Sequence, residues 1–204
     1  ITLCNVALTQ TDIIVVGTLL DADSVALYGV AVKIASLLTF FLVAINTVIA
    51  PIISQYYVEG DKVALQRLMT FSARVVTFCT LIAMCFIFFT SDWILMFFGE
   101  EYINAKDTLY ILCVASCFNA MTGAVSYLLS LSGFHLDVLR VLMLSVVINL
   151  VLSVVLVGMM GLAGAAIATT ITTLFWNFCL LVISIKRTEI NPSLAPIKVR
   201  HNKK

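Results

Sequence analysis

The sequence predicts an all-α membrane protein, a polytopic bundle of six transmembrane helices. Of its 204 residues 62% are apolar and only 11% are charged, and the mean hydropathy is +1.11. Soluble domains are about 45–50% apolar and about 25% charged. A helix needs about 20 mostly apolar residues to cross a hydrocarbon core of about 30 Å, and the chain repeats such stretches between short polar breaks.

Six stretches satisfy this length rule, and turn-forming or charged residues separate them. The expected spans are residues 2–20, 24–54, 71–90, 108–132, 136–157 and 161–185. We expect residues 1–185 to form one six-helix transmembrane lobe. Residues 186–204 carry Pro192, Pro196 and scattered basic side chains, and we expect them to form a disordered cytoplasmic tail near anionic lipid headgroups.

Three connecting regions carry signals of their own. Residues 63–69 alternate apolar and polar side chains, which is typical of an interfacial helix and equally of an extension of the following span. Residues 93–98 are too short to span, so we expect them at the outer interface with Trp93 as an anchor. The small residues of 161–166 predict close approach of another helix.

Basic residues indicate the orientation, because short loops rich in Lys and Arg stay on the cytoplasmic side. If every span crosses, ten of them lie on one side: Lys62, Arg67, Arg74, Arg140, Lys186, Arg187, Lys198, Arg200, Lys203 and Lys204. The other side holds Lys106 beside six acidic residues. Both ends of the chain are then cytoplasmic. The chain starts at Ile1 within an apolar stretch, so we expect it to be part of a longer protein.

The sequence gives no sign of an enzyme. All six cysteines fall inside apolar spans, and Cys113 and Cys117 share a helical face without a nearby His or carboxylate. His135 and His201 lie in a loop and in the tail, and glycine-rich phosphate loops are absent. We therefore expect no catalytic residue, no metal site, no cofactor and no nucleic-acid partner.

Asp12 and Lys33 are the charged residues in the interior of the expected spans, where both fall near the middle of the bilayer, and every other charged residue lies at a span edge or outside the spans. A charge there costs about 2.5–3.5 kcal/mol on insertion scales, so it normally faces a water-filled cavity or a partner. Asp12 shares a helical face with Asn5 and Thr9, within about 80° at 100° per residue.

The second expected span carries a similar stripe, because Ser36 and Thr47 lie within about 60° of Lys33. These residues predict a substrate pathway formed by Asn5, Thr9, Asp12, Lys33, Ser36 and Thr47. Alternatively, Asp12 and Lys33 pair as a structural ion bridge, and a bridge that lines a cavity can also open to an anionic substrate.

Uncharged polar residues recur in the last three expected spans. We interpret them as interhelical hydrogen-bond sites rather than substrate contacts: Asn119, Thr122, Asn149, Thr169, Thr170, Thr172, Thr173 and Asn177.

Several stretches resemble a known transporter family. They are Gln10-Thr11-Asp12-Ile13-Ile14-Val15-Val16-Gly17, Val25-Ala26-Leu27-Tyr28-Gly29-Val30-Ala31-Val32-Lys33-Ile34, Ile94-Leu95-Met96-Phe97-Phe98-Gly99-Glu100-Glu101-Tyr102 with Ala105, and Gly161-Leu162-Ala163-Gly164-Ala165-Ala166-Ile167-Ala168-Thr169. They are similar to the second half of polysaccharide transporters and O-antigen flippases, which belong to the multidrug/oligosaccharidyl-lipid/polysaccharide (MOP) exporter superfamily.

The resemblance implies one lobe of a MATE-like two-lobe transporter that works by alternating access in the bacterial cytoplasmic membrane. It implies an undecaprenyl-pyrophosphate-linked oligosaccharide or polysaccharide repeat unit as substrate, an N-terminal six-helix lobe as partner, and H⁺ or Na⁺ as coupling ion. Lys33 would attract the pyrophosphate, and Asp12 would pair with it or take part in ion coupling. The alternatives are a multidrug and toxin extrusion antiporter of the same superfamily and a non-transporting membrane scaffold subunit.

Overall fold

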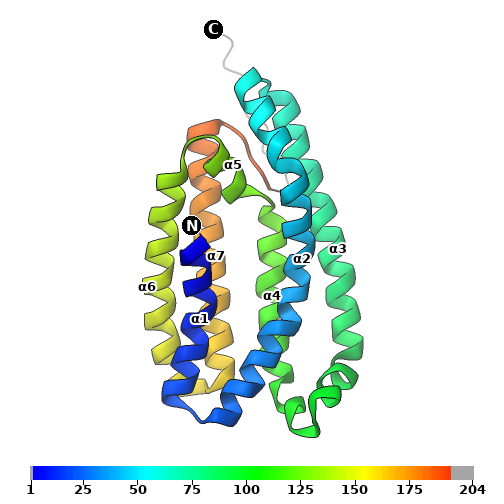
Figure 1. The fold of residues 1–204 in the computed structure, drawn as a ribbon, viewed down its shortest axis with the longest axis vertical. Helices are drawn as coiled ribbons and strands as arrows, with labels where there is room; N and C mark the ends of the chain where they lie inside the picture. The colour runs from blue at the N-terminus through cyan, green and yellow to red at the C-terminus, as the bar shows by residue number, and fades with distance from the viewer. Residues whose placement is uncertain (1, 194–204) are drawn as a thin grey trace.

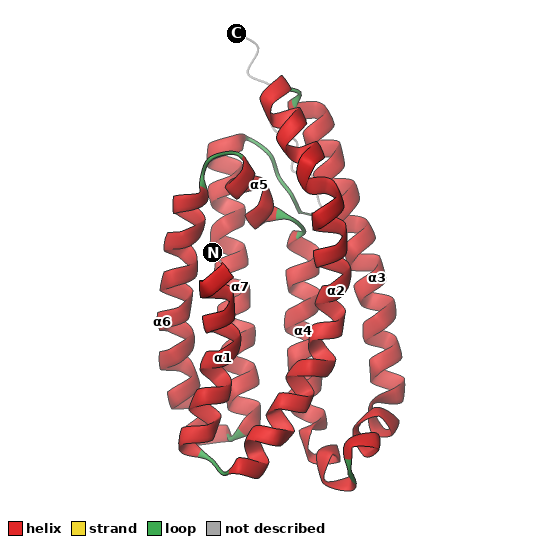
Figure 2. Cartoon of the chain, in the orientation of Figure 1, coloured by secondary structure: helices red, strands yellow, loops and turns green. Residues whose placement is uncertain are grey.

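A computed structural model describes the fold of residues 2–193 and the side chains of residues 10–193 (Figure 1). The elements in chain order are α1 (Thr2–Leu19), α2 (Ala22–Glu59), α3 (Lys62–Phe98), the 3₁₀ helix η1 (Glu100–Ala105), α4 (Lys106–Thr122), α5 (Val125–Leu131), α6 (His135–Met160) and α7 (Leu162–Thr188). The described residues contain no strand (Figure 2). The expected all-α class is confirmed.

The helices form two groups of three, joined along α4 and α7. Helices α1, α6 and α7 pack together on one side of the bundle, and α2, α3 and α4 pack on the other (Figure 1). The short helix α5 contacts α2, α6 and α7 near one end. The turns between α1 and α2 and between α6 and α7 lie with η1 at the opposite end (Figure 1).

The predicted number of six spans is not confirmed. Four helices of the described chain are long and apolar enough to cross a membrane, namely α2, α3, α6 and α7. A fifth span results if η1 and α4 are counted together with α5, despite a bend of 45° between them. Helix α1 has 18 residues, which is about 27 Å at 1.5 Å per residue and slightly less than a hydrocarbon core of about 30 Å.

Helix α3 is one continuous helix of 37 residues, so residues 63–69 and 93–98 belong to it and do not form separate interfacial helices. Asp61 caps its first turn by accepting a hydrogen bond from the Ala64 backbone at 2.9 Å. Its interior lacks Gly and Pro, and it ends at Gly99, whose φ of 140° helical residues do not adopt. Of the two interpretations of residues 63–69, the extension of the following span is correct.

The expected span 108–132 is broken at Gly123. This glycine has a φ of +62°, and a Cβ on it would lie 3.0 Å from the Ala73 Cβ and 3.3 Å from the Pro192 carbonyl oxygen. Only a residue without a side chain fits between α3 and the segment after α7 while turning the chain.

The segment after α7 packs against the bundle as far as it is described. Ile190 and Asn191 are buried, and Asn191 exchanges two hydrogen bonds with the Gln66 side chain of α3, at 2.6 and 2.8 Å. The expected disorder of residues 186–204 is therefore wrong for residues 186–193, and residues 194–204 lie outside the described residues.

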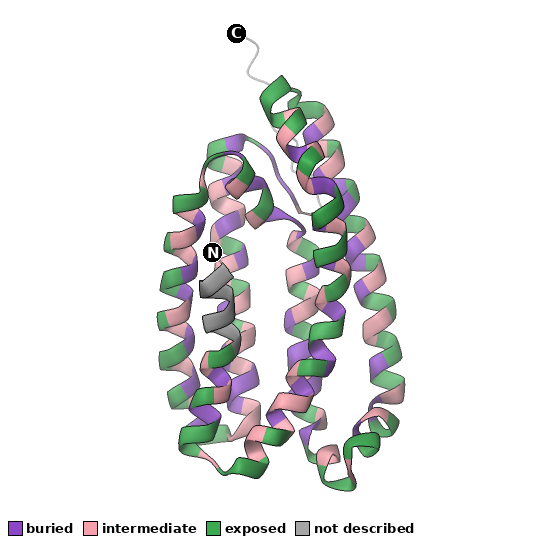
Figure 3. Cartoon of the chain, in the orientation of Figure 1, coloured by how far each residue is buried: buried purple, intermediate pink, exposed green. Residues whose placement is uncertain are grey.

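The outward faces of the helices are apolar. Large side chains such as Phe71, Phe78 and Phe89 of α3 and Val147 and Val151 of α6 are exposed (Figure 3). A soluble monomer rarely exposes contiguous apolar surface of this extent, whereas acyl chains are a suitable solvent for it. The chain is therefore a multi-pass membrane protein.

Helices α6 and α7 approach each other very closely at Gly164. A Cβ on this residue would stand 2.0 Å from the carbonyl oxygen of Leu156. The close packing predicted from the small residues of 161–166 is thus confirmed, and its partner is the preceding helix of the same hairpin.

We predict that Gly164→Ala destabilises the protein, because the new methyl group must push α6 and α7 apart. Overpacking of this kind costs about 1–3 kcal/mol. Gly158→Ala is the matched control, since a Cβ at Gly158 meets nothing within 4 Å. The measurement is the unfolding temperature of the purified full-length protein in detergent. Equal melting temperatures for the two variants would show that the close approach is not a constraint.

Candidate functional site

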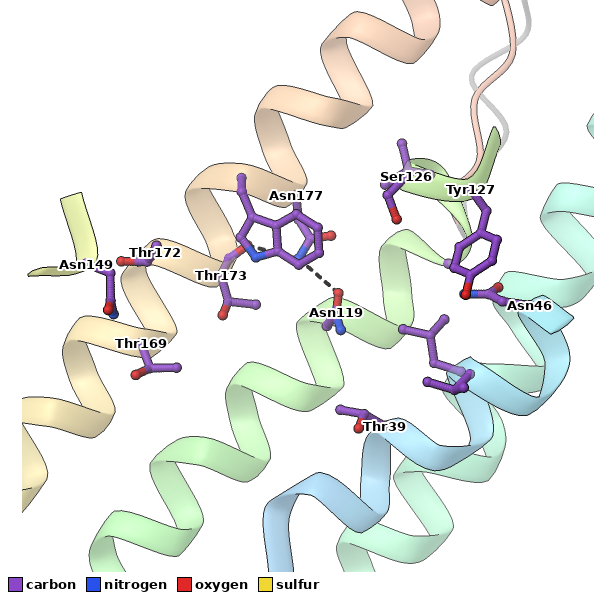
Figure 4. Close-up of a pocket in the computed structure, with 15 residues that line it drawn as sticks. Thr39, Asn46, Asn119, Ser126, Tyr127, Asn149, Thr169, Thr172, Thr173 and Asn177 are labelled. Carbon is purple, nitrogen blue, oxygen red and sulfur yellow. Dashed lines mark hydrogen bonds between the residues drawn. The ribbon is translucent and has the colours of Figure 1, made fainter. Parts of the chain in front are cut away.

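A polar groove lies between the two groups of helices. Its larger part is a cavity of about 400 Å³, and a smaller part of about 210 Å³ adjoins it. The two parts share Thr39, Asn119, Thr169, Thr173 and Trp176. The polar side chains of the larger part come from α2, α4, α5, α6 and α7, as Figure 4 shows: Thr39, Asn46, Asn119, Ser126, Tyr127, Asn149, Thr169, Thr172, Thr173 and Asn177.

Asp12 of α1 borders the smaller part and is only 2% exposed. Four neutral side chains donate hydrogen bonds to its carboxylate. Ser153 Oγ lies at 2.6 Å and Asn149 Nδ2 at 3.2 Å from Oδ1, while Tyr28 Oη at 3.3 Å and Thr169 Oγ1 contact Oδ2. The donors come from three helices, α2, α6 and α7, so the carboxylate joins both groups of the bundle. We call this arrangement the Asp12 cage.

Local helix geometry explains the cage. Asn149 and Ser153 are four residues apart on α6, so they present their side chains on one face of that helix. Thr169 lies opposite them on α7. Its Oγ1 is also 3.1 Å from the Ala165 carbonyl oxygen one turn earlier. A hydroxyl has one proton, so Thr169 donates either to this carbonyl or to Asp12, but not to both at once.

The Asp12 carboxyl group meets no positive side chain among the described residues. The ion pairs there are Lys62 with Glu189, Lys106 with Asp92, and Asp137 with Arg140 and Arg187. All of them lie near the two ends of the bundle. Within residues 10–193, the Asp12 to Lys33 ion bridge that was one interpretation of the sequence does not form.

The other predicted pathway residues are only partly brought together. Lys33 is exposed on α2 and borders neither part of the groove. Ser36 borders the smaller part, and its hydroxyl donates to the Lys33 carbonyl at 2.7 Å. Thr47 is exposed outside the groove and donates to the Val43 carbonyl at 2.9 Å. Asn5 and Thr9 lie outside the residues whose side chains are described.

Several polar residues of the later helices form the interhelical hydrogen bonds that the sequence predicted. Asn119, Thr122 and Asn177 do form interhelical hydrogen bonds, with Thr122 donating to Asn177 at 2.7 Å and Asn177 to Asn119 at 3.2 Å. The same amides also border the groove. The sequence does contain a pattern that indicates a polar face on α7. Polar or aromatic residues recur there at spacings of three and four, namely Thr169, Thr172, Thr173, Trp176 and Asn177.

Among the described residues, acidic side chains occur at both ends of the bundle, whereas most of the basic ones gather at one end. Lys62 and Arg187 lie at that end, where they pair with Glu189 and Asp137, and Lys106 lies at the end that holds η1 (Figure 1). Asp21 caps α2, and hydrogen bonds from the Ser24 side chain and backbone lower the pKa of its carboxyl group. The distribution agrees with the asymmetry of basic residues expected of a membrane protein.

Comparison with known proteins places the chain among membrane transporters by similarity. The MatE family model matches residues 1–155. A probable low-salt glycan biosynthesis flippase, Agl15 of Haloferax volcanii, is 26% identical over 184 residues, covering 86% of this chain and 38% of that protein. A probable multidrug resistance protein, NorM of Agrobacterium fabrum, is 26% identical over 197 residues, covering 92% of this chain and 42% of that protein.

An uncharacterized membrane protein of Methanocaldococcus jannaschii is 25% identical over 161 residues, covering 77% of this chain and 30% of that protein. The chain thus spans less than half the length of the curated relatives it matches. No solved structure matches the chain.

We predict that the groove admits water. A cysteine at Thr173, in a full-length protein whose own cysteines are replaced, should react with a hydrophilic thiol reagent at least about tenfold faster than one at Val151, because a thiolate does not form in hydrocarbon. Val151 is the control, being 57% exposed on the outward face of α6. Equal labelling of both cysteines would show that the groove is sealed from water.

Proposed function

Because the chain belongs to the MatE family, we propose that it is one lobe of a transporter that flips a lipid-linked oligosaccharide across the membrane. The proposed cargo is an undecaprenyl-pyrophosphate-linked oligosaccharide or polysaccharide repeat unit, and the proposed location is the bacterial cytoplasmic membrane. The observation that carries the proposal is the polar groove, which holds a buried carboxylate inside an otherwise apolar bundle.

A polar groove in a membrane is costly unless something polar uses it. Moving an unpaired amide or hydroxyl into an apolar medium costs about 2–7 kcal/mol, so a bundle that only needed to pack would fill this space with apolar side chains. A glycan has the opposite requirement, because its hydroxyl groups must keep hydrogen-bond partners while it crosses. The polar side chains of the groove would provide these partners if the groove opened to one side of the membrane and then to the other, as in alternating access.

Asp12 is the proposed coupling residue. Its carboxylate is held by neutral donors, so a small cation from solution, H⁺ or Na⁺, would neutralise its negative charge inside the membrane. Asn149 and Thr169 belong both to the Asp12 cage and to the lining of the groove. A cation that changes the hydrogen bonding of Asp12 would therefore also change the groups that the groove presents to its cargo.

Lys33 is proposed to attract the pyrophosphate of the lipid carrier. It stands exposed on α2 and forms no ion pair with any described residue. An ammonium group acts on phosphate as a point charge. The side chain lies outside the groove of this lobe, which suits a site between this lobe and an N-terminal six-helix lobe. That lobe is the proposed partner, and both ends of the described lobe are proposed to be cytoplasmic.

Drug extrusion is the second candidate, and the similarity to a probable multidrug resistance protein favours it. A cationic drug would need a negatively charged group that it can contact. Asp12 offers little to such a ligand, because it is 2% exposed and both of its oxygens already accept hydrogen bonds. The scaffold alternative relied on a structural bridge between Asp12 and Lys33, which the described residues do not form. We therefore favour glycan flipping.

The first functional test is complementation. We predict that deletion of the full-length gene abolishes surface polysaccharide, that the wild-type gene restores it, and that Asp12→Asn does not, because an amide cannot hold the coupling cation. Asp23→Asn is the matched control, since Asp23 is exposed at the start of α2. Unchanged polysaccharide in the deletion strain, with increased sensitivity to cationic drugs, would favour extrusion instead.

The role of Lys33 is tested in the same strain. We predict that Lys33→Ala lowers polysaccharide export on the order of tenfold, which corresponds to about 1.4 kcal/mol, and that Lys33→Arg retains most of it because the positive charge remains. Lys62→Ala at the end of the bundle controls for the general loss of a positive charge. If the Lys33→Ala variant exported as much polysaccharide as the wild type, the proposed role of Lys33 would be wrong.

A further inference from the structure

Three buried oxygen atoms around the larger part of the groove have no hydrogen-bond partner among the described residues. They are Asn46 Oδ1 of α2, Asn149 Oδ1 of α6 and Thr172 Oγ1 of α7, and their residues are 4%, 1% and 2% exposed. All three residues border the same cavity (Figure 4). A buried polar atom left unpaired costs about 1–3 kcal/mol, and native proteins keep few of them. Their gathering around one cavity indicates an occupant that supplies the missing bonds.

The chemistry of these atoms limits the chemical class of the occupant. Two are amide carbonyl oxygens, which only accept hydrogen bonds, and the third is a hydroxyl, which can also accept them. The occupant must therefore donate several hydrogen bonds. The described lining residues of this part of the groove include no Asp, Glu, Lys, Arg or His. Asp12 borders only the adjoining part, is 2% exposed and is already held by hydrogen bonds, so an ionised occupant of the larger part would have no counter-charge in contact with it. An occupant rich in hydroxyl groups and without net charge therefore fits best.

The apolar part of the lining limits the chemical class of the occupant further. Trp176 borders both parts of the groove, and Tyr127, Leu42 and Val43 border the larger one. A pyranose ring has hydroxyl groups around its rim and C–H groups on its faces, so one sugar can use the amides and the aromatic side chains together. The volume of about 400 Å³ lies within the range of about 300–1,000 Å³ for small-molecule sites.

We propose that the groove is a subsite for an uncharged sugar residue of the transported glycan, held by Asn46, Asn149 and Thr172 against Trp176. The inference rests on the proposed glycan flipping and specifies the substrate class at one place within it. A glycan that places a neutral hexose at this depth is then accepted, whereas one that places a uronic acid or an unsubstituted amino sugar there is disfavoured.

The test is saturation-transfer NMR on the purified full-length protein with three probes that share one ring and differ in charge: glucose, glucuronate and glucosamine. We expect saturation transfer to glucose to be at least about threefold stronger than to either charged probe, in proportion to the hydrogen bonds lost. Trp176→Leu and Asn46→Leu should weaken the glucose signal by a similar factor. Trp93→Leu, which removes a tryptophan that is 83% exposed, and Val48→Ala, on the same helix as Asn46 but 68% exposed and outside the groove, should leave it unchanged.

The outcomes separate this inference from the proposed function. Equal signals from all three probes, no signal from any of them, or a glucose signal that Trp176→Leu leaves intact in a folded protein would overturn the neutral-sugar subsite. Complementation then decides transport independently. If the wild-type gene restores surface polysaccharide while glucose gives no signal, glycan flipping stands and the subsite is wrong. A glucose signal sensitive to Trp176→Leu without any restoration would support the subsite and contradict the flippase.

Discussion

The structure depends on one interaction, the enclosure of the Asp12 carboxylate by four neutral donors inside a membrane bundle. A buried carboxylate in a medium of low dielectric needs either a counter-charge or enough hydrogen bonds to replace its hydration. This chain uses hydrogen bonds, from Tyr28, Asn149, Ser153 and Thr169. The donors satisfy the oxygens without supplying a positive charge, and this is the basis of the proposal that a small cation binds there.

This requirement explains several features of the fold. The donors of α6 and α7 can converge on one carboxylate only if these helices approach closely, and Gly164 against the Leu156 carbonyl allows that approach. On the far side of the groove the chain turns at Gly123, so that α5 can cover the end of the cavity while Ala73 and Pro192 pack against the glycine. The two largest apolar clusters lie around Leu109 and around Leu128, towards the two ends of the bundle, and a small cluster with Leu42 and Ala120 lies beside the groove.

Much of the fold could be predicted from the sequence, because the bilayer imposes a length on every apolar stretch. The helical class, the turns at Gly60 and Gly161 and the close packing at Gly164 follow from local patterns. The break at Gly123 does not, because its cause is contact with Ala73 and Pro192, which are distant in the sequence. Hydropathy alone could not show that α3 continues from Lys62 to Phe98, because the mixed polar and apolar residues 63–69 also fit a separate interfacial helix.

The site was predicted only in part. Asp12 was identified because a carboxylate in an apolar stretch is conspicuous, but its donors Asn149, Ser153 and Thr169 come from segments more than 130 residues away. Asn and Thr are common in membrane helices as packing residues, so their type alone does not reveal a groove. Lys33 was expected to share a site with Asp12, yet its side chain is exposed and borders no part of the groove.

The most direct test of the central claim is the unfolding temperature of the full-length protein as a function of cation. A ligand that binds the native state stabilises it by mass action. If Na⁺ neutralises Asp12, the melting temperature of the wild type should be higher in NaCl than in choline chloride at equal ionic strength. If the cation is a proton, acidification should raise the melting temperature instead. In either case Asp12→Asn should lose the response. Identical responses of wild type and Asp12→Asn to both sodium and pH would contradict the claim and leave Asp12 as a sealed structural contact.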